Sequence, residues 1–206
     1  MYVPAHFSFA ERADIVAFMR RFNFAALVSQ VEGAPFATHL PFIVEERGDE
    51  EIWLLAHFAK ANPQWKNLEA QTTLVIFQEP HAYISPSLYS KELNVPTWNY
   101  VAVHAYGRAK LLNDEAAMFA LLEKQMQTFE KEYFEQWTRL PQDYKNAMLK
   151  GIVAFEMKAE KLESKWKLSQ NKPEKDRANV TAHLLESEDG AAKQVGEMMR
   201  DFYTKS

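Results

Sequence analysis

The sequence contains no cysteine, and it has neither a long apolar run nor a signal-like start. The missing thiols exclude disulfide bonds, thiolate metal sites and a cysteine nucleophile, and they are typical of a reducing compartment. No apolar stretch approaches the length of a bilayer-spanning helix, and the first residues lack the basic and then apolar pattern of a secretory signal. We therefore expect a cytoplasmic protein that has no membrane segment.

Glycine is also scarce, with six residues scattered along the chain. This excludes the glycine-rich phosphate loops of Rossmann and Walker proteins, and the Gly-x-Ser-x-Gly pattern of serine hydrolases is missing too. The formal net charge is −4, so no overall positive field would attract nucleic acid or anionic lipid. No acid–base pair identifies catalytic residues, and the sequence leaves open whether the protein is an enzyme.

The composition is that of a folded chain with a sizeable core, because 47% of the residues are hydrophobic and 25% are charged. Apolar periodicity and turn residues give the expected elements. The strands cover residues 24–31, 36–45, 51–57, 72–78, 95–112 and 152–157, and the helices cover 8–22, 62–70, 114–136, 143–150, 173–185 and 191–203. Short strands joined by tight turns, with helices grouped later, predict an α+β fold whose antiparallel sheet closes into a barrel.

The charge and hydrophobicity of the chain change near Glu160. From there onward the sequence is highly charged, and we expect it to be mostly helical. This predicts a barrel domain with inserted helices over residues 1–160. A helical C-terminal extension over residues 161–206 would pack on the barrel or on a second subunit.

The stretch from Leu54 to Trp65 predicts a strand, a short loop and a helix with a specified first turn. Asn62 is a good N-cap, and Pro63 suits the first helical position because it has no amide proton to satisfy. Lys60 lies just before this cap, and a cation beside a helix N-terminus favours an anion, most often a phosphate. The alternative is a plain helix start, since Asn-Pro begins many helices that bind nothing.

Metal and nucleic-acid sites find little support. His39, His57 and His104 lie on expected strands, but no two histidines have the spacing of a metal pair, and strand histidines usually have structural roles.

The C-terminal helix pair resembles a helix-turn-helix, yet residues 174–206 contain seven acidic residues against five basic ones. Direct DNA binding is therefore doubtful, because a recognition helix needs positive neighbours.

Hydroxyl, amide and aromatic residues gather in two stretches near the middle of the chain. Together they could build a flat slot for a planar heteroaromatic ligand, which needs apolar faces and a few donors around its rim. The alternative is an ordinary core of a β-protein. The residues concerned are Tyr83, Ser85, Tyr89, Thr97, Trp98 and Asn99.

Six stretches, in this order and at these separations, resemble the PaiB family, described as FMN-binding negative transcriptional regulators. They are MYVPAHF (1–7), GAPFATHLPF (33–42), HFAKANPQW (57–65), YISPS (83–87), VPTWNY (95–100) with Val103 and His104, and SQNKP (169–173). The resemblance covers nearly the whole chain. It implies the FMN-binding split barrel, shared with pyridoxamine phosphate oxidases and flavin reductase-like proteins, and a homodimer with flavin in a groove between the subunits.

The resemblance also implies roles for individual residues. Lys60 would hold the FMN phosphate, with amides from the turn at Asn62, and His57 belongs to the same site. Where relatives often have arginine, this chain has Lys60 and Lys172, which keep the charge and lose the bidentate fork. The other expected contacts are Thr38, His39 and Leu40 along the ring or ribityl tail, Ser85 and Trp98 at the pocket border, and Trp166, Ser169, Gln170 and Asn171 from the partner subunit.

These implications favour an FMN-binding homodimer that acts as a negative transcriptional regulator or a redox-sensing flavoprotein. The alternatives are a haem-binding protein or a flavin-dependent oxidoreductase of the same superfamily, in which the flavin would supply the redox chemistry.

Overall fold

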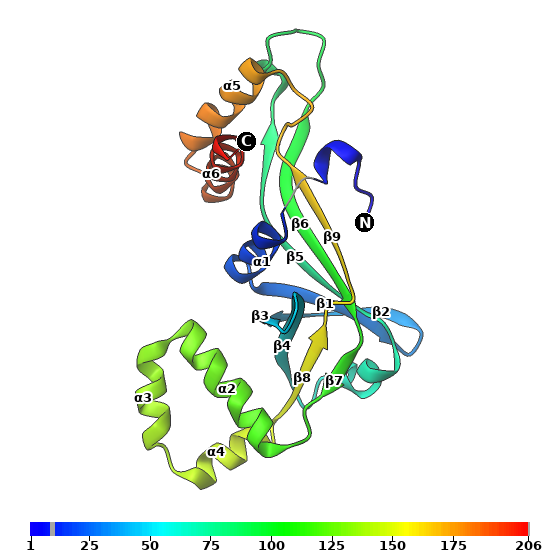
Figure 1. The fold of residues 1–206 in the computed structure, drawn as a ribbon, viewed down its shortest axis with the longest axis vertical. Coiled ribbons are helices and arrows are strands. Elements are labelled where there is room, and N and C mark those ends of the chain that lie inside the picture. Colours follow the sequence, from blue (N-terminus) through cyan, green and yellow to red (C-terminus); the bar gives the residue numbers. More distant parts are fainter. Residues whose placement is uncertain (9–10, 206) are drawn as a thin grey trace. The chain divides into compact units, whose positions relative to one another are not determined.

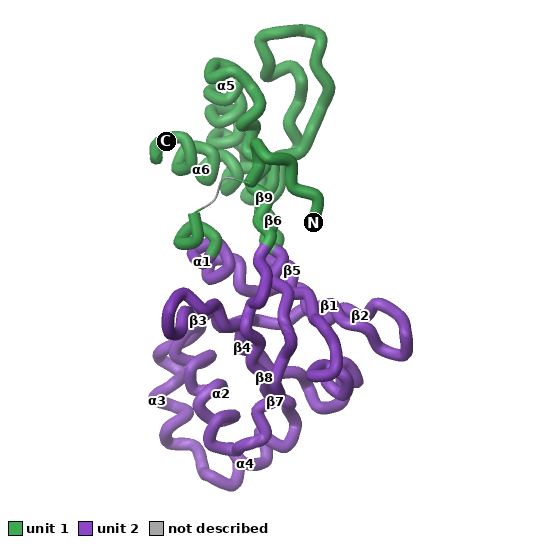
Figure 2. Tube along the Cα trace, turned by 45° about the vertical axis from the view of Figure 1, so that its right-hand side comes forward, with its two compact units in different colours: residues 1–15, 78–103, 163–206 green, residues 16–77, 104–162 purple. Residues whose placement is uncertain are grey.

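The computed structural model describes residues 1–8 and 11–205 (Figure 1). By its internal contacts the chain divides into two compact units (Figure 2). Unit 1 consists of residues 1–15, 78–103 and 163–206, and unit 2 of residues 16–77 and 104–162. Three strands contribute residues to both units, and the division predicted at residue 160 stays a prediction. Among the described residues, no helix has the length and apolar character needed to cross a membrane.

Unit 2 begins its sheet structure with a hairpin of β1 (Phe24–Val31) and β2 (Ala34–Pro41). The prediction for β1 is confirmed at both ends. Glu32 and Gly33 form the turn with positive φ values of 52° and 80°, as a two-residue hairpin requires. The predicted second strand over 36–45 is two strands, because the chain leaves the first sheet at Pro41 and continues as β3 (Ile43–Arg47) in another.

The second sheet has the order β3-β4-β8-β7, with β4 (Glu51–Ala59), β7 (Ala109–Leu111) and β8 (Ile152–Lys158). Its paired strands are antiparallel, as predicted. Helix α2 (Glu115–Phe129) packs its Leu121 against Leu55 of β4. Asp114 caps α2 by accepting a hydrogen bond from the Ala117 amide at 3.0 Å.

The single helix predicted over 114–136 is wrong, because the chain breaks at Glu130 and continues as α3 (Lys131–Arg139). Glu130 has the non-helical values φ −156° and ψ 85°. Helix α4 (Gln142–Leu149) follows, close to its predicted bounds.

The predicted helix over 8–22 is α1 (Arg12–Arg21). Its expected beginning includes residues 9 and 10, which lie outside the described residues.

The other sheet has the order β2-β1-β5-β6-β9, with β5 (Thr73–Ile84), β6 (Thr97–Gly107) and β9 (Lys161–Lys167). Strand β5 continues past Gln78, where the prediction ended it. The expectation of helical structure from residue 160 is wrong over β9. There, charged residues alternate with Leu162, Ser164 and Trp166, which is the two-residue period of a strand.

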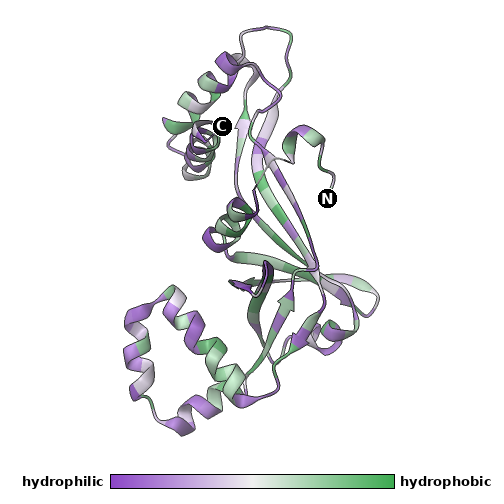
Figure 3. Cartoon of the chain, in the orientation of Figure 1, coloured by the Kyte–Doolittle hydropathy of each residue, from purple (hydrophilic) through white to green (hydrophobic). Residues whose placement is uncertain are grey.

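Phenylalanine rings form the core of unit 2 between its two sheets. Phe42 lies 5.8 Å from Phe77 of β5 and 6.2 Å from Phe155 of β8, and Phe155 stacks on Phe58 of β4 at 5.0 Å, measured between ring centroids. All four are almost completely buried. Figure 3 shows hydrophobic residues along these strands and in the first turns of α2. Because these rings come from strands of both sheets, their packing holds the two sheets of unit 2 together.

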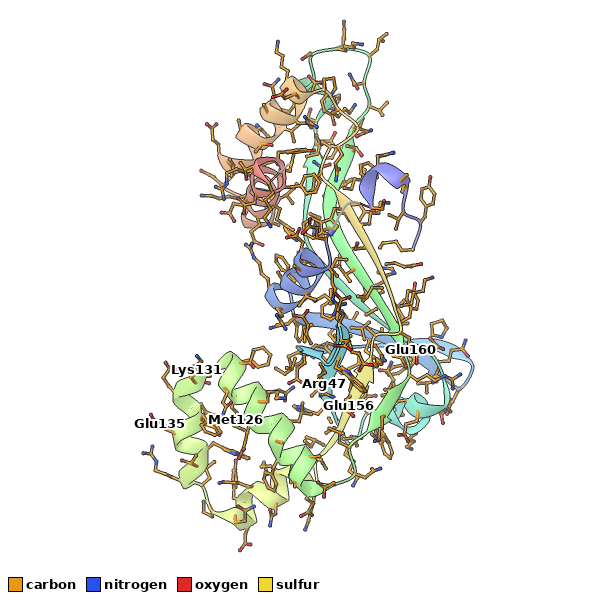
Figure 4. The ribbon with its side chains drawn as sticks, in the orientation of Figure 1. Arg47, Met126, Lys131, Glu135, Glu156 and Glu160 are labelled. Carbon is orange, nitrogen blue, oxygen red and sulfur yellow. The ribbon has the colours of Figure 1, made fainter. Side chains whose placement is uncertain are left out.

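A charged network crosses the outer side of the second sheet. Arg47 donates to Glu156 at 2.7 Å, and Figure 4 labels both residues. Arg47 also donates to Glu45 at 2.9 Å, and Lys124 of α2 pairs with Glu45. The Arg47 guanidinium lies 4.7 Å from the centroid of the Trp53 ring. Burial alone would raise the pKa of Glu45, but hydrogen bonds from Lys124 and Arg47 outweigh it and lower the pKa. The network therefore ties β3, β8 and α2 together through charges.

Unit 1 contains the predicted C-terminal helix pair, α5 (Glu174–Leu185) and α6 (Gly190–Thr204). These helices lie on one side of β6 and β9 (Figure 1). The Trp166 ring stacks on Phe202 of α6 at 6.5 Å, and Asn99 Nδ2 is 3.4 Å from Met199 Sδ. Two short 3-10 helices, η1 (Ala5–Phe7) and η3 (Pro86–Leu88), complete the unit.

Gly107 lies where β6 approaches the end of β8, and a Cβ atom placed there would be 2.1 Å from the Lys158 carbonyl oxygen. We expect Gly107→Ala to lower the free energy of unfolding by about 3 kcal/mol, because a backbone atom cannot move away cheaply. Denaturant titration followed by circular dichroism measures this. Gly190→Ala is the control, since a Cβ at Gly190 has no atom within 4 Å. Equal stability of the two variants would contradict the close approach.

Candidate functional site

Lys60 follows the last residue of β4, and its backbone is held on both sides. Its amide donates to the Gly151 carbonyl oxygen at 2.8 Å, and its own carbonyl accepts from the Trp65 indole nitrogen at 3.0 Å. The side chain is exposed, and among the described residues it has no acidic partner. The backbone is therefore fixed while the ammonium group is available to an anion.

The helix after Lys60 is η2 (Pro63–Ala70), a 3-10 helix in which the predicted cap is confirmed. Asn62 Oδ1 accepts from the Gln64 amide at 2.9 Å, with Pro63 at the first helical position. Asn62 Nδ2 donates to Thr38 Oγ1 on β2, also at 2.9 Å. The cap is thus hydrogen-bonded to the hairpin as well as to its own helix.

Gln64 is the centre of this network and is 0% exposed. Its side-chain nitrogen lies 2.9 Å from Ser29 Oγ and 3.0 Å from the Phe36 carbonyl oxygen, and its Oε1 accepts from Thr38 Oγ1 at 2.6 Å. One buried amide therefore joins η2 to both strands of the hairpin. The sequence does not indicate this role for Gln64, because a glutamine after Asn-Pro carries no signal of its partners on distant strands.

Strand alternation separates the three residues predicted on β2. Thr38 lies opposite Leu27 and Leu40 opposite Ala25, on the buried side of the hairpin. His39 points to the other side, is exposed and stacks on Phe24 with 6.1 Å between ring centroids. Thr38 and Leu40 can therefore face one ligand together, whereas His39 cannot face it with them from the same strand.

His57 lies on the face of β4 that α2 covers. Its Nδ1 is 2.9 Å from Gln125 Oε1, and burial lowers the pKa of the imidazole despite this hydrogen bond. The ring is therefore neutral near pH 7, and its Nδ1 is hydrogen-bonded to Gln125 of α2. Its predicted contact with a cofactor stays a prediction.

The remaining predicted residues belong to unit 1. Ser85 Oγ caps η3 by accepting from the Ser87 amide at 3.2 Å, and the Trp98 side chain is 50% exposed. Trp166 is buried against α6, and Asn171 is exposed. All four residues belong to unit 1, and their predicted roles in a flavin site stay predictions.

Ser169 and Gln170 use their polar atoms inside unit 1. Ser169 is 3% exposed, has a φ of 67°, and its Oγ accepts from Asn99 Nδ2 at 2.8 Å. The Gln170 side chain accepts from the Leu168 amide at 2.8 Å and donates to the Trp166 carbonyl oxygen. The SQNKP stretch thus forms the turn that ends β9.

A surface hollow of about 490 Å³ lies where β1, β2 and β5 meet the end of β6. Its lining combines the apolar side chains of Val28 and Leu74, the Tyr106 ring and the hydroxyl residues Ser29 and Thr73. Thr73 is fully buried, and its Oγ1 has no hydrogen-bond partner. The sequence does not indicate this hollow, because its residues come from segments far apart in the chain.

No group of three or more histidine, cysteine or acidic side chains suitable for a metal ion is present among the described residues. His39 lies on the exposed side of β2, whereas His57 lies beneath α2. The histidines of unit 2 therefore do not converge on one metal site among the described residues.

Comparison with known proteins places these features in context. The model of the family described as "Putative FMN-binding domain" matches residues 1–161. The chain is 42% identical over 205 residues to the protein named "Protease synthase and sporulation protein PAI 2" from Bacillus subtilis (strain 168), a match that covers 98% of this chain and 97% of that protein.

Two solved structures show the same fold at low sequence identity. A conserved hypothetical protein from Mycobacterium tuberculosis has a TM-score of 0.59 and 15% identity, over 84% of this chain and 94% of that chain. A protein described as binding FAD and haem, from Mycobacterium smegmatis, has a TM-score of 0.58 and 14% identity, over 84% of this chain and 78% of that chain.

We expect Gln64→Leu to lower the free energy of unfolding by about 3 kcal/mol, because it leaves buried groups on β1 and β2 without partners. Thermal and denaturant unfolding measure the loss. Gln71→Leu is the matched control, since the Gln71 side chain bonds Gln30 and Asn67 at the surface, where water can replace it. If both variants lose the same stability, the buried network does not have the role assigned to it.

Proposed function

The chain belongs to the PaiB family, whose members carry this FMN-binding domain, and from that premise we propose that it binds FMN through unit 2. The single observation that carries the proposal is Lys60, whose backbone is fixed by Gly151 and Trp65 while its ammonium group has no acidic partner among the described residues. The capped start of η2 follows directly.

The phosphate of FMN fits the Lys60 corner electrostatically. An ammonium group and the positive end of a capped helix both favour an anion, and a backbone that is already ordered loses little entropy on binding. The buried Gln64 network keeps the start of η2 against the hairpin. Thr38 of β2 is hydrogen-bonded to Asn62, so it is the candidate on this strand to contact the phosphate end of the ligand.

The hollow is suited to a planar ring. Its volume is within the range of small-molecule sites, and its walls combine the apolar side chains of Val28 and Leu74 with the Tyr106 ring. An isoalloxazine ring has apolar faces and polar atoms at its rim, which matches this lining. Bound FMN would supply hydride and electron transfer, while the protein would position the ring and exclude water.

We further propose that the protein is a homodimer and that its two sheets form a split barrel. Phe24 is 65% exposed on the outer side of the hairpin. On the same side, Ala26 pairs with Ile76 and Val28 with Leu74, and all four are only half-buried. A second copy seated on this apolar face would also cover the hollow, which Val28 and Leu74 line.

The proposed biological role is that of a redox-sensing protein or negative transcriptional regulator that acts without direct contact to duplex DNA. The acidic balance of residues 174–206 supports this, because the C-terminal helix pair lacks the positive charge that a recognition helix needs. Binding of flavin at a subunit interface would let the redox state of the ring influence the assembly.

We expect Lys60→Ala to weaken FMN binding on the order of 10- to 100-fold, because a charge-assisted hydrogen bond to the phosphate is lost. Quenching of flavin fluorescence on titration measures the affinity. Riboflavin, which lacks the phosphate, should bind both proteins equally well.

Lys193→Ala is the control, because it removes an exposed lysine of α6 in unit 1. Three results would overturn the proposal: no FMN binding by the unaltered chain, an equal effect of Lys193→Ala, or an equal loss for riboflavin.

The dimer predicts a second result. Phe24→Asp should convert the protein to a monomer in analytical ultracentrifugation, because it places a charge on the apolar face at its most exposed ring. Phe129→Asp, at another exposed phenylalanine, should leave the mass unchanged. A monomeric unaltered protein, or a dimer that survives Phe24→Asp, would contradict this interface.

A further inference from the structure

The outer side of the β1–β2 hairpin, which carries Phe24, lies on strands that are almost free of ionisable side chains. Strands β2, β1 and β5 are neighbours in one sheet. Strands β1 and β2, together with residues 73–78 of β5, contain no acidic residue, lysine, arginine or tyrosine, and their one histidine is His39. Its imidazole is therefore the only side chain on these segments that changes its charge between acidic and neutral pH.

His39 lies beside Phe24, which is 65% exposed. The two rings stack, with 6.1 Å between their centroids and 23° between their planes. His39 is itself exposed and lies opposite Ala26 of β1, and Ala26 pairs in turn with Ile76 of β5. The imidazole therefore belongs to the same apolar face on which the second copy is proposed to sit.

Charged groups on the elements before and behind the hairpin contact other residues. At the end of α1, Arg20 pairs with Glu46 of β3, and the Arg21 guanidinium lies 5.2 Å from the centroid of the Phe22 ring. The second sheet packs on the buried side through the phenylalanine core, so its charged network lies beyond that core.

Helix η2 also approaches the hairpin from the buried side, where the Gln64 side chain bonds Thr38. Its two charged residues, Lys66 and Glu69, therefore belong to the side opposite His39. The elements that pack behind the hairpin thus bring no carboxylate to the imidazole.

Beyond β5, the same face continues on β6. Tyr106 lines the hollow together with Val28, and the His104 ring lies 6.3 Å from the Tyr106 ring between centroids. Lys161 of β9 lies 5.4 Å from the centroid of the Tyr106 ring. Strand β5 separates these groups from His39, and none of them is a carboxylate. Among the described residues, no acidic side chain pairs with His39.

We propose that His39 makes the homodimer sensitive to pH: a second copy binds on the Phe24 face while the imidazole is neutral, and it dissociates when the imidazole gains a proton. This inference rests on the dimer proposed above. A partner that covers Phe24 also covers the ring stacked on it, and burying a charged ring without an acidic partner costs far more than burying a neutral one.

The direction of the effect follows from where the proton can be held. In the monomer His39 is exposed, and water solvates the charged ring. In the dimer the ring faces apolar side chains, so protons favour the monomer. Both copies use the same face in a two-fold dimer, and each brings its own His39, so two protons oppose assembly. We expect the dissociation constant of the dimer to rise on the order of 10- to 100-fold from about pH 7.5 to about pH 5.5.

The experiment measures the dissociation constant of the dimer by analytical ultracentrifugation of the full chain at these two pH values and one ionic strength. Circular dichroism at both pH values checks that the protein stays folded. If the chain unfolds at the lower pH, the comparison of His39→Lys with the unaltered chain at the higher pH decides, because lysine carries a permanent charge there.

Three variants assign the effect to one ring. His39→Gln keeps a polar, uncharged side chain and should dimerise equally well at both pH values. His39→Lys should weaken the dimer about tenfold or more even at the higher pH. His183→Gln is the matched control, because it removes an exposed histidine of α5 in unit 1, and it should keep the full pH dependence.

The inference is overturned if the folded, unaltered chain has the same dissociation constant at both pH values, if His39→Gln keeps the pH dependence, or if His39→Lys dimerises as well as the unaltered chain. It is also overturned if His104→Gln, and not His39→Gln, removes the dependence. Failure of the proposed dimer itself appears separately, as a monomer already at the higher pH, whereas a dimer that persists at both pH values contradicts the pH inference alone.

Discussion

The buried side-chain amide of Gln64 is the interaction on which the candidate site depends. It joins η2 to β1 and β2 in a place that water does not reach, so each partner it holds would otherwise be a buried polar group without a hydrogen bond. Because the same helix begins at Asn62, the network also fixes where the chain leaves β4. Lys60 therefore has an ordered backbone and a free ammonium group, which is the arrangement that an anion needs. The position of a surface charge is set here by a buried, uncharged residue.

Aromatic side chains pack in both units, but against different elements. In unit 2, phenylalanine rings fill the space between two sheets, and Lys60 follows the end of β4. In unit 1, helices α5 and α6 cover one face of the strands, while aromatic rings and lysines remain on the other. In unit 2 the Lys60 ammonium group, which has no acidic partner among the described residues, favours an anion.

Local sequence signals predicted the parts of this account that depend on neighbours along the chain. Asn62 and Pro63 form the expected cap because capping needs only the next two residues, and β1 has its predicted ends because a tight turn follows it. Strand β9 was missed, since its high charge hid the alternation that Trp166 continues. The grouping of Thr38, His39 and Leu40 disregarded the same alternation, which sends His39 to the other side of the sheet. Gln64 could not be predicted, because its partners lie on strands about 30 residues away.

The central claim is that the corner held by Gln64 presents Lys60 to the phosphate of FMN. A crystal structure of the protein grown with FMN tests this most directly. The account predicts the phosphate within hydrogen-bonding distance of Lys60 Nζ, about 2.7–3.2 Å, beside the start of η2. A phosphate bound elsewhere, with the Lys60 side chain directed into solvent, would contradict it.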